Sequence, residues 1–228
     1  MKKMDGKEEF LDFLLETGAL RFGDFILKSG RESPYMVDMG RMSSGSNADR
    51  IGAHFAEAII ERIGDAHVIF GPAYKGIPLC VSAAMHLDAM LDHPVHYLFD
   101  RKGQKTYADG GTGARGLVCG RIPERGESIV MIDDVITCGQ TKIASVHLLQ
   151  TLQPDANISG LVVAIDRQEL DENGEYTAGS FQAREGIPFH SIATASDILE
   201  YLKQQKLEEH ATKMQAYLNK YGIREVRQ

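Results

Sequence analysis

The chain has 228 residues, 43% hydrophobic and 25% charged, a balance typical of a single globular domain that buries a substantial core. Its 25 basic and 32 acidic residues give a net charge of -7, which argues against a general nucleic-acid binder, because such proteins carry a basic excess. The three cysteines lie far apart and suggest neither a zinc site nor a disulfide framework; with no signal peptide and no apolar run of about 18 residues, we expect a cytoplasmic protein without membrane segments.

The N-terminal part of the chain predicts a helix followed by two strands and a second helix. Residues 7–17 have amphipathic helical spacing, with Phe10 and Phe13 on the apolar side. Residues 20–41 predict two short strands around a glycine-containing turn. Residues 47–63 again carry apolar side chains at helical spacing.

From residue 67 onward, strands and helices alternate. The predicted strands are 67–70, 95–99, 128–132, 159–165 and 190–194. The predicted helices are 78–91, 142–152, 195–205 and 208–221. This alternation predicts an α/β fold with right-handed crossovers and a central parallel sheet flanked by helices. Ligands of such sheets bind at the carboxyl ends of the strands, so we expect the chemistry in the loops after residues 70, 99, 132 and 165.

The most informative segment is residues 129–141, IVMIDDVITCGQT. A buried strand leads directly into Asp133 and Asp134, and a short loop of small residues precedes a helix that starts near Lys142. The free backbone N–H groups at a helix N-terminus bind anions, and the helix dipole adds only about 0.3–1 kcal/mol. The loop is therefore a candidate phosphate site.

The two aspartates require a separate explanation, because carboxylates would repel a neighbouring phosphate. Ribose hydroxyls or a divalent metal between the carboxylates and the phosphate would interact favourably with both groups, which suggests a sugar phosphate as ligand. The structural alternative is an acidic turn followed by a helix cap. The whole segment resembles the signature of the type I phosphoribosyltransferases, which bind phosphoribosyl pyrophosphate. By resemblance, the donor-binding residues here are Asp133, Asp134, Val135, Ile136, Thr137, Cys138, Gly139, Gln140 and Thr141. Cys138 needs no catalytic role.

Four further segments narrow the resemblance to the orotate phosphoribosyltransferases. They are residues 27–35, 70–78, 101–105 and 166–169. The family implies a single domain over residues 1–228, in which a hood of approximately residues 1–45 covers a core of approximately residues 46–228.

Two lysines in these segments are candidates for contact with anionic substrates. Lys28 lies in the turn between the two N-terminal strands, where it is either a solvated turn residue or a cover over an anion. By resemblance it contacts both substrates. Lys75 lies at a strand end in GPAYKG, a tight turn in which glycine permits close approach to a ligand. By resemblance Tyr74 and Lys75 bind phosphoribosyl pyrophosphate.

A third segment places three cations, Arg101, Lys102 and Lys105, at the start of a glycine-rich stretch without periodicity. Such a stretch is either a solvated basic loop or a lid that neutralises the leaving pyrophosphate and excludes water. In the family this loop closes over the active site of the other subunit, so a homodimer is implied. Tyr107 stands where the family commonly has histidine.

Arg167, which follows the strand at 159–165, is the candidate residue for recognising the acceptor base. An arginine can hold a carboxylate by two parallel hydrogen bonds, and orotate carries a carboxylate that purine bases lack. A surface salt bridge is the alternative. By resemblance Arg167 binds orotate with Thr137 and Lys28, and Met36 and Val37 stand where the family often has two aromatic residues.

The resemblance as a whole implies an orotate phosphoribosyltransferase activity in the synthesis of UMP. Its expected catalytic residues are Lys105, Arg101, Asp133 and Asp134. Mg²⁺ is expected without a direct protein ligand, held through the substrate and by Asp133 and Asp134 through water. The alternatives are another base phosphoribosyltransferase and a regulator that binds the donor without turning it over. Arg167 and the hood segment argue against the first, and the acidic balance and Lys105 argue against the second.

Overall fold

A six-stranded sheet forms the centre of the molecule, in a computed structural model that describes residues 6–27, 29–103, 113–136 and 139–224. Its strands are β3 (Val68–Gly71), β4 (His96–Asp100), β5 (Val118–Gly120), β6 (Ser128–Val135), β7 (Asn157–Asp166) and β8 (Phe189–Thr194). They lie in the order β5-β4-β3-β6-β7-β8, and all neighbours are parallel except β4 and β5. The predicted α/β fold with a parallel sheet is confirmed, with one antiparallel edge strand that was not predicted.

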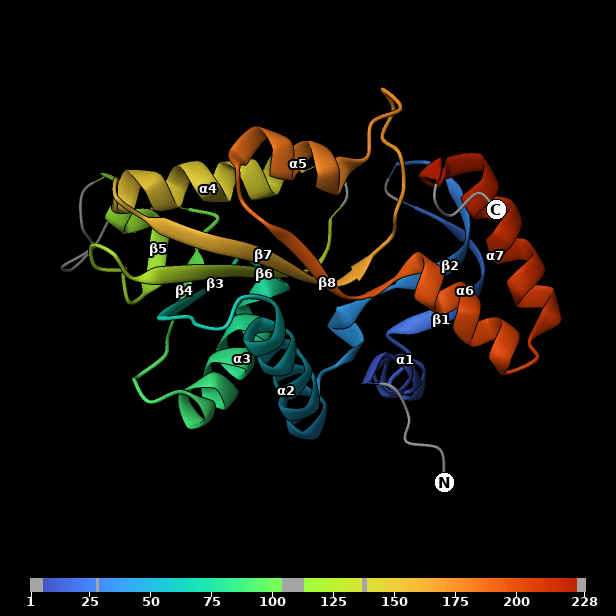
Figure 1. Cartoon of the computed structure of the whole chain (residues 1–228), viewed down its shortest axis with the longest axis horizontal. Helices are drawn as coiled ribbons and strands as arrows, with labels where there is room; N and C mark the ends of the chain where they lie inside the picture. The colour runs from blue at the N-terminus through green and yellow to red at the C-terminus, as the bar shows by residue number, and fades with distance from the viewer. Residues whose placement is uncertain (1–5, 28, 104–112, 137–138, 225–228) are drawn as a thin grey trace.

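Helices cover both faces of this sheet (Figure 1). Helices α2 (Gly45–Arg62) and α3 (Gly76–Met90) pack on one face, and α4 (Gln140–Leu152) and α5 (Thr177–Glu185) pack on the other. The residues of β6 are therefore buried on both sides, which explains why its sequence is a continuous apolar run rather than an alternating one.

A second, two-stranded sheet lies at the β8 end of the molecule (Figure 1). It consists of β1 (Leu20–Ile26) paired antiparallel with β2 (Glu32–Val37), preceded by α1 (Gly6–Glu16). The C-terminal helices α6 (Ala195–Gln204) and α7 (Glu208–Tyr221) lie beside it. Short 3-10 helices η1 (Met39–Arg41) and η2 (Gly113–Leu117) complete the described elements.

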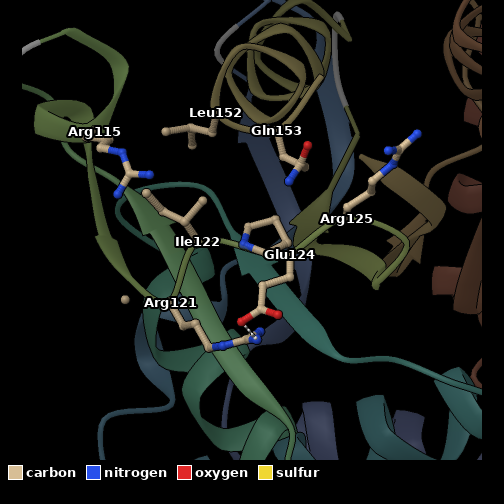
Figure 2. A pocket seen from close by; sticks show the side chains of 9 residues that line it. Arg115, Arg121, Ile122, Glu124, Arg125, Leu152 and Gln153 are labelled. Atoms are coloured by element: carbon tan, nitrogen blue, oxygen red, sulfur yellow. Dashed lines mark hydrogen bonds and ion pairs between the residues drawn. The ribbon is translucent and has the colours of Figure 1, made fainter. Parts of the chain in front are cut away.

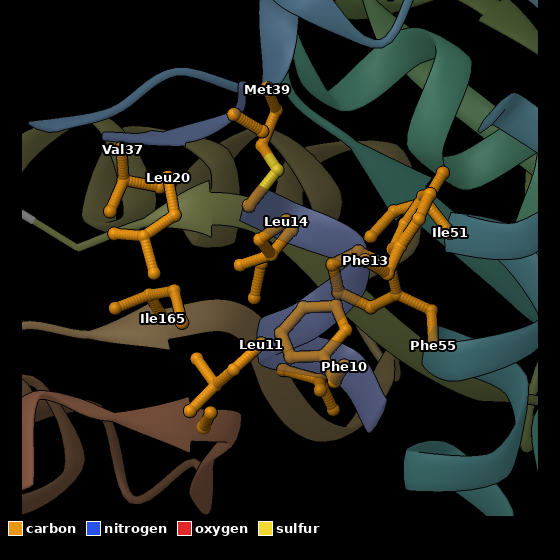
Figure 3. Packing of buried hydrophobic residues seen from close by; sticks show 14 of the residues in the cluster. Phe10, Leu11, Phe13, Leu14, Leu20, Val37, Met39, Ile51, Phe55 and Ile165 are labelled. Carbon is orange, nitrogen blue, oxygen red and sulfur yellow. The ribbon is translucent and has the colours of Figure 1, made fainter. Parts of the chain in front are cut away.

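The hydrophobic core joins this N-terminal part to the central sheet. Figure 3 shows Phe10, Phe13 and Leu14 of α1 packing among side chains from β1, α2 and β7. The three side chains have no solvent exposure. At roughly 1.5–3 kcal/mol for each fully buried large apolar side chain, this contact fixes α1 and the β1–β2 hairpin against the core.

Most of the predicted elements are confirmed to within a few residues, whereas one strand and one α-helix were missed. Strand β5 has only three residues beside a glycine-rich stretch, and α5 has nine residues of which Ala178 and Phe181 are buried. Neither is long enough to establish a clear period. In the described part of the chain, no helix is both long and apolar enough to cross a membrane.

Candidate functional site

The two predicted aspartates lie at the carboxyl end of β6 and are buried, each with 7% exposure. Asp133 forms an ion pair with Lys142 in the first turn of α4. Asp134 Oδ2 lies 2.9 Å from Lys75 Nζ. The other carboxylate oxygens accept backbone hydrogen bonds, Asp133 Oδ1 from Asp134 N and Asp134 Oδ1 from Val135 N, both at 2.8 Å. Each negative charge thus has its own lysine.

Protonation of this cluster follows from burial and from the paired charges. Burial raises the pKa of the Asp133 carboxyl, and the Lys142 ammonium opposes that rise. For Lys75, burial acts to lower the pKa, but the hydrogen bond and charge of Asp134 and the charge of Asp38 hold it above its ordinary value. Lys75 therefore stays cationic beside the aspartates.

Lys75 also connects three segments that are far apart in the sequence. Its Nζ lies 3.5 Å from Asp38, at the exit of the β1–β2 hairpin, as well as 2.9 Å from Asp134 at the end of β6. Because the Lys75 side chain is 47% exposed, its ammonium remains accessible to an anion. The structure thus brings together Lys75 and Asp134, two residues expected from the sequence to bind the same ligand.

The turn that positions Lys75 depends on two glycines. A Cβ atom at Gly71 would lie 2.1 Å from the carbonyl oxygen of Gly76, so no larger residue fits without moving the backbone. The Gly76 amide donates to the Pro72 carbonyl, and the Ala73 amide donates to Asp100. Tyr74, next to Lys75, is 71% exposed.

The described part of the predicted phosphate loop begins with Gly139, which has a φ of 70° and immediately precedes α4. This left-handed conformation favours glycine and orients the first turn of the helix, with Gln140 and Thr141, toward the carboxyl edge of the sheet. Ile136 is buried in the core, so its side chain does not face a ligand. Thr137 and Cys138 lie outside the described residues.

Arg167 is the centre of a buried polar cluster rather than of a surface salt bridge. Its side chain is 7% exposed, and its Nε donates to Glu169 Oε1 at 2.7 Å. Its Nη2 donates to Ser33 Oγ at 3.2 Å and to Tyr217 Oη at 3.3 Å. The guanidinium carbon lies 4.1 Å from the centre of the Tyr35 ring. Arg167 thus connects β7 with the β1–β2 hairpin and α7.

The Tyr35 hydroxyl is buried in the same cluster and has no hydrogen-bond partner among the described residues. Burial raises the pKa of this phenol well above its ordinary value, so it stays protonated. A buried hydroxyl without a partner costs about 1–3 kcal/mol. The cluster therefore holds an unused hydrogen-bonding group beside an arginine.

The other predicted residues are placed as follows. Val37 is buried in the core, whereas Met36, which alternates with it along β2, is half-buried and pairs with Arg21 across the hairpin. Arg101 is held by its own contacts with the backbone of β5 and η2, where its Nε donates to Val118 O at 3.1 Å. Lys102 Nζ lies 3.7 Å from Asp100. Lys28, Lys105 and Tyr107 lie outside the described residues.

A cavity of about 680 Å³ lies elsewhere, between η2, the segment after β5 and the end of α4 (Figure 2). Two of the arginines that line it are paired with carboxylates: Arg121 with Glu124 and Glu127, and Arg125 with Asp155. The 13-residue α4, about 20 Å long, separates this end of the helix from its N-terminus. None of the predicted site residues lines the cavity.

Sequence reasoning missed several members of the two clusters. Lys142 was expected only as the start of a helix, yet it is buried against Asp133. Ser33 and Tyr217 contact Arg167 from positions 134 and 50 residues away in the chain. A lysine in the first helical turn after an aspartate pair could have indicated the Lys142–Asp133 contact from the local sequence. The contacts of Ser33 and Tyr217 with Arg167 join distant parts of the chain, so no local sequence pattern could have indicated them.

A parallel sheet whose β6 ends in paired acids, followed by a glycine-initiated helix, defines the chain as a type I phosphoribosyltransferase in fold. No family model matches the chain. A crystal structure of orotate phosphoribosyltransferase from Francisella tularensis superposes with a TM-score of 0.79 at 31% identity, covering 94% of this chain and 100% of that one.

Relatives in sequence agree with this likeness. An orotate phosphoribosyltransferase of Pseudomonas aeruginosa is 39% identical over 95% of this chain and 98% of its own length. One of Clostridium beijerinckii is 33% identical over 96% and 98%. The chain belongs to the orotate phosphoribosyltransferase family.

Proposed function

We propose that this protein transfers the 5-phosphoribosyl group of phosphoribosyl pyrophosphate to orotate, giving orotidine 5'-phosphate and pyrophosphate in the synthesis of UMP. The observation that carries the proposal is the buried Asp133–Asp134 pair at the end of β6, with Lys142 at the start of α4 and Lys75 just before α3 as its two lysines. Membership of the family supports it across almost the whole chain.

The donor would lie across the carboxyl edge of the sheet. Residues 137–141 and the first N–H groups of α4 would hold the 5-phosphate, because these amides have no partner within the helix. Asp133 and Asp134 would hold the ribose hydroxyls, and Tyr74 and Lys75 the pyrophosphate. The lysines offset the repulsion that two carboxylates would exert on a phosphorylated ligand.

The acidic pair suits an indirect role toward magnesium. All four carboxylate oxygens of Asp133 and Asp134 already contact a lysine or a backbone amide. Mg²⁺ keeps several waters and is commonly held by substrate phosphates. The aspartates would therefore contact such an ion through water, and the ion, when bound to the donor, would supply positive charge to the pyrophosphate.

Arg167 is the proposed recognition residue for the orotate carboxylate. Its buried position over Tyr35 and beside Ser33 supports a fixed guanidinium orientation. Glu169 at present accepts the Nε hydrogen bond, so an incoming carboxylate would share or replace that contact. Lys28, Met36, Val37 and Thr137 complete the proposed base site beneath a hood of approximately residues 1–45.

A homodimer would complete the active site, with the loop of one subunit, carrying Arg101, Lys102, Lys105 and Tyr107, closing over the other. Departure of pyrophosphate leaves positive charge on the ribose carbon, and the loop cations would stabilise the leaving group. Three large hydrophobic side chains support an unfilled interface on α3 and β4: Met85 and Met90 on α3 and Tyr97 on β4 are 68%, 50% and 42% exposed.

The activity is tested by mixing the protein with Mg²⁺, orotate and phosphoribosyl pyrophosphate and following the loss of orotate absorbance. We expect orotate to fall in step with pyrophosphate release, and only when the donor is present. Asp134→Asn should slow the reaction, whereas Asp155→Asn, an exposed aspartate paired with Arg125, should not. No orotate consumption at any Mg²⁺ concentration would show that the proposed function is wrong.

A further inference from the structure

Two histidines and an aspartate gather at the edge of the central sheet opposite to Asp133 and Asp134. Asp65 and His67 lie in the connection from α2 to β3, and His93 lies in the connection from α3 to β4. Since β3 and β4 are parallel neighbours, their amino ends meet at the same edge. The cluster therefore lies on the far side of the sheet from the phosphoribosyl site.

The ligand atoms of these residues lie close together. Asp65 Oδ1 is 2.7 Å from His93 Nε2, and Asp65 Oδ2 is 3.4 Å from His67 Nδ1. One ligand atom from each of the three residues lies within 4.8 Å of the other two. The imidazole rings are stacked, with centres 4.3 Å apart and planes 10° from parallel.

We propose that Asp65, His67 and His93 form a binding site for one divalent transition-metal ion of the zinc, cobalt or nickel class. Imidazole and carboxylate are ordinary ligands of these ions, whereas Mg²⁺ favours oxygen ligands throughout. The three side chains are 49%, 33% and 32% exposed, so water can supply the remaining coordination position.

Surrounding groups hold the proposed ligands in position. The Ser128 hydroxyl, at the start of β6, lies 3.0 Å from His67 Nδ1 and 3.4 Å from Asp65 Oδ2. His93 Nδ1 lies 3.3 Å from the Pro94 carbonyl oxygen. A bound ion would take the place of the proton that His93 Nε2 shares with Asp65 Oδ1, 2.7 Å away. Donation from Nδ1 to the Pro94 carbonyl would then hold the ring in the orientation common for a metal-binding histidine.

Binding requires a small local movement. With metal–nitrogen bonds of about 2.0 Å, tetrahedral ligand atoms lie about 3.3 Å apart, so the two stacked rings must turn toward a common point. The rings are on loops and partly exposed, so side-chain rotation suffices. The ion would tie the α2–β3 connection to the α3–β4 connection and thereby stabilise the folded chain.

The test is a titration of chelator-treated full-length protein with Co²⁺ and then with Zn²⁺. We expect one saturable equivalent with the visible absorption of low-coordinate Co²⁺, displaced by Zn²⁺, and a rise in Tm that 1:1 Mg²⁺ does not produce. His93→Gln and Asp65→Asn should each weaken binding at least about tenfold.

His86→Gln is the matched control, because His86 also contacts an aspartate, Asp49 at 3.1 Å, but is not a member of the three-residue cluster. It should bind Co²⁺ as the parent does. If His93→Gln does not fold, Asp65→Asn alone decides. Absence of saturable binding, or affinity equal to the parent's in the ligand variants that fold, would overturn the proposal. Orotate consumption is measured separately and does not enter this result.

Discussion

At the scale of single residues, the candidate site depends on buried charges that each have an opposite partner. Asp133 and Lys142 are 7% and 6% exposed and contact each other directly. Forming such a pair gains little net stability, because both ions lose their hydration. Breaking it by removing one partner is costly, since it leaves a buried charge without compensation.

Lys142→Met should therefore lower the free energy of unfolding by about 3–5 kcal/mol. Chemical denaturation measures this change. Lys213→Met is the control: Lys213 pairs with Glu209 one helical turn away in α7 with both side chains exposed, and should cost no more than about 0.5 kcal/mol. Equal small effects for both variants would mean that Lys142 does not pair with Asp133 in the folded protein.

Arg167→Ala should weaken orotate binding by about 1.5–3 kcal/mol, the scale of a hydrogen bond to a charged group. Calorimetric titration with orotate measures the change. Arg125→Ala, which removes an 83% exposed arginine, is the control and should bind orotate normally. Because Arg167 is buried, Arg167→Lys provides a second variant that keeps the charge but loses the planar fork of donors. Unchanged orotate affinity in both Arg167 variants would contradict the assignment.

The placement of the candidate-site residues was predictable from sequence where the signal is local. Asp133, Asp134 and Lys75 lie in short segments whose strand ends and glycines point to the carboxyl edge of a sheet. The pairing of Asp134 with Lys75 joins β6 to the start of α3, 59 residues earlier, so it depends on the order of strands and could not be read from either segment.

At the scale of elements, α1 is held to α2 by contacts that include a half-buried histidine. His54 of α2 lies 5.0 Å from the ring centre of Phe10 and 5.7 Å from that of Phe13. Burial lowers the pKa of His54 below its ordinary value, because the charged imidazole would lose its hydration among apolar side chains.

This shift predicts a loss of stability in acid. Above the ordinary histidine pKa of 6.5, both the folded and the unfolded chain keep His54 neutral. As the pH falls below 6.5, the unfolded chain binds a proton first, so stability decreases until the lower pKa of the folded state is passed. His54→Gln should reduce this decrease in denaturation experiments from pH 7 downward. His147→Gln, which changes an exposed histidine, is the control and should leave the decrease of stability with pH as in the parent. If stability falls with pH as steeply in His54→Gln as in the parent, the prediction is wrong.

The sequence predicts elements best where they are long and strongly periodic. The 18-residue α2 and the continuously apolar β6 were found within a few residues. Strand β5 was not, because its three residues are held in the sheet by pairing with β4 rather than by a pattern of their own. The antiparallel edge of the sheet is therefore a consequence of tertiary contacts.

At the scale of the whole molecule, the proposed homodimer predicts that activity depends on assembly. Met85→Glu would replace an exposed apolar side chain of α3 with a charged one. This change should weaken the proposed dimer interface and lower activity in parallel. Leu207→Glu, at a 40% exposed position between α6 and α7, is the control. Sedimentation measured beside activity decides: a fully active monomer would contradict closure of the loop over the neighbouring subunit.

The central claim is that the protein transfers a phosphoribosyl group to orotate. Its specificity among acceptor bases tests this claim most directly. The measurement is kcat/KM for orotate, uracil, adenine, hypoxanthine and nicotinate, each with saturating phosphoribosyl pyrophosphate and Mg²⁺. We predict that orotate is preferred over uracil, which lacks the carboxylate, by about 10-fold to 150-fold, the equivalent of roughly 1.5–3 kcal/mol. Purines should react more slowly still. Preference for a purine or for uracil over orotate would contradict the account.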